Sequence, residues 1–398
     1  MNPDKNTAPF APVLPALALL STVFLANFLA RTVFGPLLLP ISEHLGRSLA
    51  ASANLFVFLS GGYSLSVLCA GFISKVLGHK GTIVASVAGI GLGLLGLAES
   101  DTFIGFSVWI AIMGASAGLY MPSGVVTITE ITPPAHWGQA FSVHELAPNL
   151  AFIASPLIAE AFMGTAGYSA LFRLLGASCL LLAAVYALRG PRTLRPGMPP
   201  VLGNIKTIVT RPAFWIIVIL FTLAVGVEVG VYNMVPAFLV MEKGVSRETA
   251  NIILGASRAV SLIFLPATGW IIGRIGYRRT LALCLLGTGI STVLAGYGPL
   301  WWTVSMLTLQ PIFVVCFFPV GFSVLAMVCP KATGDLSVSL TVMCTSIVGA
   351  GLIPALLAWS GERFSFALSF VLFGVAIFII SLAAISRLRI PNPDNSRK

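Results

Sequence analysis

The chain has 398 residues, of which 57% are hydrophobic and only 9% are charged. Soluble domains carry about 25% charged residues, so a chain this apolar with so few charges is expected in a membrane rather than in water. The net charge of +10 does not indicate nucleic-acid binding, because the cations stand in short segments between apolar stretches rather than on one soluble face.

Twelve apolar stretches have the length of about 20 residues that a membrane-spanning helix requires. In chain order they cover residues 14–40, 50–74, 81–98, 103–131, 139–163, 168–188, 213–240, 248–272, 279–297, 300–328, 335–359 and 364–386. Glycine and proline inside them are tolerated, because neighbouring helices satisfy the backbone groups that these residues free. The sequence predicts an all-α integral membrane protein with twelve transmembrane helices.

The segment Arg189–Pro212 is the polar stretch in the middle of the chain. It carries five cations, five prolines and no acid. The prolines exclude one continuous helix, and the charge is typical of a cytoplasmic loop. The predicted domains are therefore an N-terminal six-helix bundle over residues 1–190, a cytoplasmic linker over 191–212, and a C-terminal six-helix bundle over 213–398.

The distribution of Lys and Arg predicts the orientation. Sixteen of the 23 fall on the side of the membrane that holds both termini and the linker, and five fall on the other side. The positive-inside rule then places both termini in the cytoplasm. We expect a multi-pass protein of the plasma membrane, which is the inner membrane in a bacterium. The N-terminus lacks a signal-peptide cleavage site, and nothing indicates a state other than a monomer.

The two halves repeat at an offset of 196 to 198 residues. The segment from Gly71 (GFISKVLGHK) matches the segment from Gly269 (GWIIGRIGYR) at an offset of 198. Three proline positions, 40, 122 and 156, have counterparts at 236, 319 and 354. This spacing predicts two parallel six-helix repeats, which in transporters meet at a midplane binding site.

On these features the sequence resembles the major facilitator superfamily over essentially its whole length. The family motif G-x-x-x-D-R-x-G-R-R corresponds to Gly71–Lys80, where Lys75 stands at the Asp position, and more weakly to Gly269–Arg278. The family run E-x-x-P…R-G corresponds to Glu130, Pro133 and Gly138, with Trp137 at the Arg position. The resemblance implies two pseudo-symmetric bundles and alternating access. The departures imply that the family's cytoplasmic charge lock is partly dismantled.

The first helix is also similar to one branch of this family. Asn27 and Arg31 look like the N-x-L-x-R run of anion–cation symporters, in which the arginine meets the substrate carboxylate. Arg258 lies in the middle of another apolar stretch. A charge inside a bilayer costs about 2.5–3.5 kcal/mol even on the lenient insertion scale, so each arginine is a substrate-binding candidate for an anion. The alternative for each arginine is a structural ion pair, which for Arg31 would be with Glu228 or Glu145.

Three further groups are candidates for proton coupling. Glu228 lies mid-helix and either binds and releases a proton or neutralises an arginine, and both hold if proton and substrate compete for one ion pair. His144 and Glu145 lie near the start of the fifth span as a possible proton relay. The alternative is that they line a solvated vestibule. Four polar residues complete the substrate-binding candidates, although an interhelical hydrogen bond is the commoner role for each: Tyr120, Tyr232, Asn233 and Gln310.

The predicted function is secondary transport of a small organic anion, such as a carboxylate, coupled to protons. The alternatives are proton-coupled efflux of amphipathic drugs or metabolites, and a membrane receptor built on a transporter fold. The G-x-G-x-x-G match at Gly91–Gly96 lies inside an apolar helix with no strand before it, and no G-x-x-x-x-G-K-[ST] motif occurs. The sequence therefore predicts no cofactor, no metal site and no enzyme activity; the expected partners are an anionic small molecule, protons and the bilayer.

Overall fold

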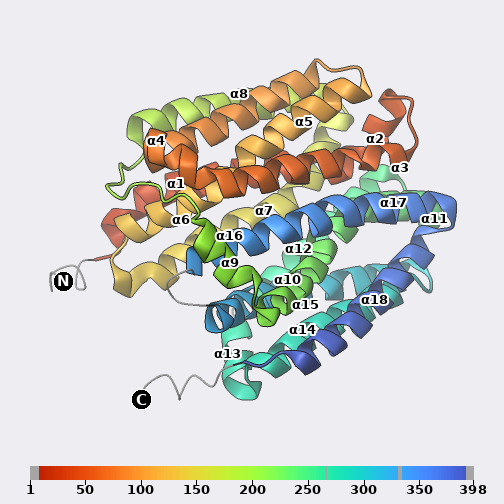
Figure 1. The fold of residues 1–398 in the computed structure, drawn as a ribbon. Helices are drawn as coiled ribbons and strands as arrows, with labels where there is room; N and C mark the ends of the chain where they lie inside the picture. The colour runs from red at the N-terminus through yellow and green to blue at the C-terminus, as the bar shows by residue number, and fades with distance from the viewer. Residues whose placement is uncertain (1–8, 265–266, 330–333, 391–398) are drawn as a thin grey trace. The chain divides into compact units, whose positions relative to one another are not determined.

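The computed structural model describes residues 9–264, 267–329 and 334–390, and every regular element in them is helical (Figure 1). Internal contacts divide the chain into two units. Unit 1 comprises Met1–Gly46 and Phe58–Pro199, and unit 2 comprises Arg47–Val57 and Pro200–Lys398. The short stretch Arg47–Val57 thus packs with the second unit, although it lies inside the predicted N-terminal bundle. Both chain ends, predicted to be cytoplasmic, lie outside the described residues.

Unit 1 is built from helices that follow the predicted apolar stretches, and two of its spans, Ala11–His44 and Phe103–Ile131, each comprise two consecutive α-helices. The α-helices are α1 (Leu14–Thr32), α2 (Phe34–His44), α4 (Leu55–Ala98), α5 (Phe103–Gly118), α6 (Tyr120–Ile131), α7 (Trp137–Met163) and α8 (Gly167–Arg189). The helices approach closely where residues are small. A Cβ on Gly91 would lie 2.8 Å from the carbonyl oxygen of Gly176 in α8. The G-x-G-x-x-G run therefore serves helix packing.

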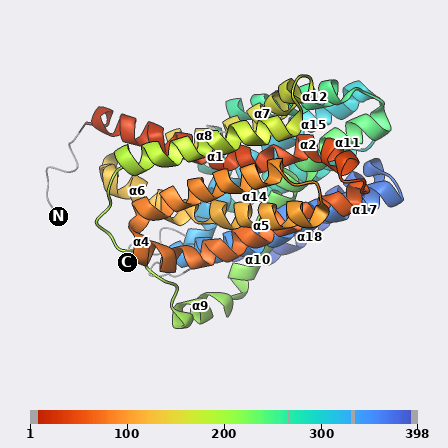
Figure 2. The ribbon, with the colours of Figure 1, turned by 90° about the horizontal axis from the view of Figure 1, so that it is seen from above.

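Unit 2 contains a short helix that belongs to the predicted linker. This helix, α9, precedes α10 (Figure 2). The elements of the unit are α3 (Leu49–Ala53), α9 (Leu202–Val209), α10 (Pro212–Val225), a π-helical segment (Gly226–Val231), α11 (Tyr232–Lys243), α12 (Arg247–Phe264), α13 (Ala267–Ile275), α14 (Tyr277–Ala295), α15 (Leu300–Val328), α16 (Gly334–Thr345), a second π-helical segment (Ser346–Leu352), α17 (Ile353–Arg363) and α18 (Phe366–Arg387).

The helices agree with the predicted twelve-span pattern. Within the described ranges, nine helical stretches are long and apolar enough to cross a membrane, or ten if Arg247–Phe264 and Ala267–Ile275 form one span. The 50-residue stretch Leu49–Ala98 is too long for one span of about 20 residues and holds two predicted spans. With the 19-residue helix Tyr277–Ala295, every predicted range has its helix. The predicted all-α membrane fold is confirmed.

The repeat seen in the sequence is also present in the backbone. Gly78 interrupts α4 at φ 66° and ψ 166°, and Gly276, its counterpart 198 residues later, precedes α14 at φ 77° and ψ 164°. Gly46 and Gly244, also 198 apart, both have positive φ, at 58° and 67°. Side chains with a Cβ rarely adopt such backbone angles. The repeated glycines therefore mark the same two chain reversals in each unit.

Replacement of Gly78 by Ala should lower the free energy of unfolding by about 1–2 kcal/mol, because a Cβ disfavours the positive φ that the turn requires. Space is not the reason, since a Cβ there would meet no atom within 4 Å. Gly203→Ala is the matched control, because that glycine is equally open and has no positive φ. Thermal unfolding of the detergent-solubilised variants measures the difference. Equal stability of the two variants would contradict this account of the turn.

Candidate functional site

The guanidinium of Arg31 is the charged candidate group of α1. It lies one residue before the end of α1, and its Nε donates to the carbonyl oxygen of Asn27 at 3.3 Å. Its Cζ atom lies 4.2 Å from the ring centroid of Phe28 and 4.7 Å from that of Tyr63. The Nη2 atom is buried without a hydrogen-bond partner among the described residues. Arg31 therefore rests on two aromatic faces, which attract a cation but do not neutralise it.

No described acid of unit 1, Glu145 included, forms an ion pair with Arg31. The neighbouring candidate, Asn27, is buried and donates its Nδ2 to the carbonyl oxygen of Ala117 at 3.0 Å. That bond ties α1 to α5. The side chain of Asn27 thus forms an interhelical hydrogen bond, whereas Arg31 keeps one donor, Nη2, without a hydrogen bond among the described residues.

His144 lies in the interior of unit 1 rather than in a solvated vestibule. Its ring is 1% exposed and stacks on Phe24, with centroids 4.1 Å apart. The hydroxyl of Tyr120 donates to the carbonyl oxygen of Leu20 at 3.0 Å and lies 2.9 Å from Nε2 of His144. Since that hydroxyl has one proton, Nε2–H is the donor to Tyr120. Nδ1 then carries the lone pair, 3.7 Å from a carboxylate oxygen of the half-exposed Glu145.

Tyr120→Phe should lower the free energy of unfolding by about 1–2 kcal/mol, because the buried Nε2–H of His144 loses its acceptor. Tyr186→Phe is the control, since the hydroxyl of Tyr186 is also buried and meets the hydroxyl of Thr127, which keeps its own bond to the carbonyl of Ser123. Its removal should cost less stability than Tyr120→Phe. Thermal unfolding in one detergent compares the two. Equal losses would argue against the hydrogen-bond chain.

Glu228 and Arg258 form a buried ion pair in unit 2. Nη1 of Arg258 lies 2.8 Å from a carboxylate oxygen of Glu228, and Nη2 donates to the backbone carbonyl of the same residue at 2.8 Å. The side chains are 4% and 10% exposed. The ring centroid of Tyr232 lies 4.9 Å from the Cζ of Arg258. Three predicted site residues are thus brought together, with the arginine held by an acid of the protein.

A π-helical segment, Gly226–Val231, carries Glu228. Single-turn π segments widen a helix, disturb its hydrogen-bond ladder and occur often at functional sites. The second such segment, Ser346–Leu352, lies against the first, and a Cβ on Gly230 would meet Ile353 at 2.9 Å and the carbonyl oxygen of Gly349 at 3.3 Å. The irregular backbone beside the ion pair is therefore packed without room for larger residues.

The remaining candidates serve packing or lie near the pair. Gln310, in α15, donates its Nε2 to the hydroxyl of Thr292 in α14 at 2.7 Å, which is the interhelical role. Asn233 follows Tyr232 in α11 and is buried. Over the described ranges, no group of three His, Cys, Asp or Glu side chains is arranged to hold a metal ion.

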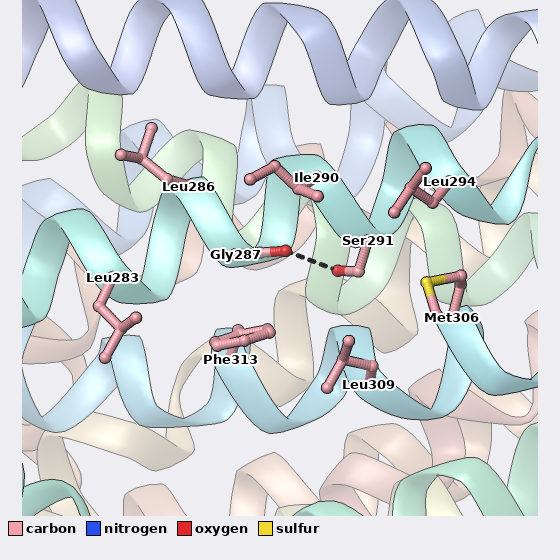
Figure 3. Close-up of a pocket in the computed structure, with 9 residues that line it drawn as sticks. All are labelled: Leu283, Leu286, Gly287, Ile290, Ser291, Leu294, Met306, Leu309 and Phe313. Carbon is pink, nitrogen blue, oxygen red and sulfur yellow. Dashed lines mark hydrogen bonds between the residues drawn. The ribbon is translucent and has the colours of Figure 1, made fainter.

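Two grooves in unit 2 are apolar and do not suit an anion. Figure 3 shows the first, of about 390 Å³, between α14 and α15, where the hydroxyl of Ser291 is already donated to the carbonyl of Gly287. The second, of about 590 Å³, is lined by residues of α3, α17 and their neighbours, again without a charged side chain. Exposed lining residues such as Leu283, Ile290 and Trp359 are typical of a surface that faces lipid.

Two aromatic residues beside Arg31 were missed by the sequence analysis. Phe28 lies three residues before Arg31 and hence on the same helix face, which the helical period could have revealed. No local signal identifies Tyr63, which comes from α4. A further signal was available, because Arg31 and Glu228 are 197 residues apart. The repeat thus places opposite charges at corresponding positions of the two units, each at a break in the regular helix.

Comparisons with known proteins identify the kind of molecule. A family model described as the Major Facilitator Superfamily matches residues 20–257 and 230–398. A probable nitrate/nitrite transporter, NarK2 of Mycobacterium tuberculosis, is 23% identical over 304 residues, which are 74% of this chain and 76% of that protein.

Solved structures share the fold. A bacterial homologue of the human lysosomal transporter Spinster, inward-facing and occupied, has a TM-score of 0.74 at 16% identity, and the match covers 96% of each chain. A POT family transporter in complex with a thioalcohol-conjugated peptide has a TM-score of 0.78 at 16% identity, covering 94% of this chain and 96% of that one.

Proposed function

Because the chain belongs to the major facilitator superfamily, we propose that this membrane transporter carries a small monovalent anion by alternating access, coupled to protons. Arg31 is the anion-binding residue of unit 1, and the Glu228–Arg258 pair is the coupling site of unit 2. The family and the transporter fold make it a multi-pass carrier rather than an enzyme.

The observation that carries the proposal is that no acid among the described residues forms an ion pair with Arg31. A guanidinium in a membrane helix is costly unless an opposite charge compensates it. In unit 1 the guanidinium contacts the ring of Phe28, the ring and polar group of Tyr63 and a backbone carbonyl, and no described acid pairs with it. The missing negative charge is that of the substrate. An oxyanion can accept two parallel hydrogen bonds from a guanidinium.

In unit 2 the carboxylate of Glu228 occupies Arg258 as an anion would. Protonation of Glu228 removes the charge that Arg258 requires, and a substrate anion then replaces it. Release of the proton restores the ion pair and expels the anion. In this proposal the proton and the anion compete for one ion pair. Because the side chains of Arg258 and Glu228 are only 4% and 10% exposed, little water can screen the electrostatic attraction between the guanidinium and its anion.

His144 supports a proton path in unit 1. Its Nδ1 is buried without a hydrogen-bond partner and lies 3.7 Å from the carboxylate of Glu145, which is 47% exposed. A proton can therefore pass from the exposed carboxylate to an imidazole held in one tautomer by Tyr120. Glu145 is the entry of this path and His144 its acceptor.

The substrate group is a planar oxyanion of charge −1. Organic carboxylates, nitrate and nitrite share this chemistry. The resemblance of Asn27 and Arg31 to the N-x-L-x-R run of anion–cation symporters favours a carboxylate, while the similarity to NarK2, a probable nitrate/nitrite transporter, supports the inorganic anions. The carrier acts as a monomer in the plasma membrane of its cell, the inner membrane in a bacterium, with both termini in the cytoplasm, as the bias of Lys and Arg favours.

Uptake into proteoliposomes under an imposed pH gradient tests the function. The panel is nitrate, nitrite, acetate and lactate, with phosphate and the amphipathic cation ethidium as contrasts. Accumulation of at least one planar anion, with proton co-movement reported by an internal pH dye, supports the proposal, and the panel distinguishes inorganic from organic substrates. Movement of ethidium without any anion would overturn it in favour of drug efflux.

A further inference from the structure

The carboxylate of Glu130 holds a part of the linker. Glu130 lies at the end of α6, and one of its oxygens accepts a hydrogen bond from the backbone N–H of Leu194 at 2.8 Å. The side chain of Leu194 is 94% exposed, so the backbone amide, rather than the side chain, makes the contact. This hydrogen bond joins two residues that lie 64 positions apart in the sequence, and it attaches the linker to unit 1.

The same linker segment lies directly on the backbone of α4. A Cβ built on Gly71 would lie 2.5 Å from the carbonyl oxygen of Met198. A Cβ on Gly197 would collide with Ser74 and would lie 2.5 Å from the backbone nitrogen of Lys75. Both surfaces need glycine because backbone meets backbone. Leu194–Met198, called the strap below, is therefore fitted to unit 1 rather than passing over it.

The strap lies where the family motifs are altered. Lys75 stands at the family's Asp position, and Trp137 stands at the Arg position and donates its Nε1 to the carbonyl of Thr132 at 3.0 Å. Among the described residues no cation forms a salt bridge with Glu130. Glu130 is retained, but its acceptor oxygen serves the strap.

We propose that Glu130 latches the strap to unit 1. The hydrogen bond to an ionised carboxylate supplies the attraction. The two glycine contacts supply the fit. This device is independent of the transported substrate, since it involves none of the residues assigned to anion or proton binding.

Limited trypsin digestion of the purified full-length protein tests the latch. The bond after Arg192 lies two residues before Leu194, whereas Arg195 precedes a proline and resists trypsin. A protease must hold several residues in an extended form, so cleavage after Arg192 requires the strap to leave unit 1. Glu130→Ala leaves the cleaved sequence unchanged and should raise the cleavage rate about tenfold, the factor expected for loss of one charge-assisted hydrogen bond.

Two further variants make the outcome decisive. Gly197→Ala places a methyl group against Ser74, which should displace the strap from unit 1 and also raise the rate of cleavage after Arg192. Glu99→Ala removes an exposed acid that binds Arg173 at 2.8 Å and should leave the rate at the wild-type value. New cleavage elsewhere would reveal misfolding, so rates are compared at Arg192 alone, on protein that elutes as one peak. Wild-type rates in both Glu130→Ala and Gly197→Ala would overturn the latch.

Discussion

Arg31→Gln is expected to lower kcat/KM for the transported anion at least about 100-fold, because the amide keeps much of the shape but offers the anion no charge. The protein should still fold, since no described acid of unit 1 loses a partner. The kcat/KM of Arg31→Lys should lie between those of the wild type and Arg31→Gln, because an ammonium keeps the charge without the planar pair of donors. Uptake of the anion identified by the panel, in proteoliposomes with equal amounts of carrier, gives the comparison.

Arg173→Gln is the matched control for this loss. Arg173 also carries one charge in unit 1, but it is 56% exposed and pairs with the exposed Glu99. Surface ion pairs contribute about 0–1 kcal/mol, so uptake should change less than about threefold. Similar uptake by Arg31→Gln and the wild type would remove Arg31 from substrate binding and, with it, the observation on which the anion assignment rests.

Glu228→Gln is expected to abolish accumulation driven by a pH gradient while exchange of labelled for unlabelled anion continues. The amide cannot release a proton, so it cannot return to Arg258 as a charged competitor. The variant should also be less stable without substrate, by about 3–5 kcal/mol, because the buried guanidinium of Arg258 loses the charge of the carboxylate that it contacts. Added anion should restore part of that stability, which thermal unfolding with and without anion measures.

The double variant Glu228→Gln/Arg258→Gln separates coupling from simple structure. Removing both charges should recover stability, since replacing a buried pair by neutral groups is often neutral or favourable. Transport should stay abolished if the pair exchanges with the substrate. Recovery of both stability and accumulation would instead mean that the pair is only structural. Glu248→Gln, an exposed acid of α12, controls for the loss of one negative charge.

Much of the fold could be predicted because membrane helices leave a strong sequence signal. Apolar stretches of about 20 residues specify the spans without knowledge of their neighbours. The repeat from Gly71 to Gly269 indicated two related halves, and the paired turns at Gly78 and Gly276 have the same backbone angles. The resemblance to the major facilitator superfamily is confirmed by the family model over both halves.

The site was less accessible to prediction, because the candidate residues were chosen by charge and position alone. Glu228 had several possible partners, and its carboxylate lies against Arg258. Asn27 and Gln310 were candidates for substrate contact, and both donate to groups on other helices. The helical period shows which residues share a face, but it does not show which faces meet. The roles of these residues in transport remain predictions for the experiments above.

By itself the sequence determined that this chain crosses a membrane repeatedly, that its two halves are related, and that Arg31, Glu228 and Arg258 lie in apolar surroundings. Only the tertiary structure decided that Glu228 neutralises Arg258 while Arg31 rests on Phe28 and Tyr63. The physical reason is that membrane insertion depends on local sequence, whereas the pairing of side chains depends on residues far apart in the sequence. Transfer of a helix into lipid depends on its own side chains, whereas the pairing of two charges depends on the rotation and packing of neighbouring helices.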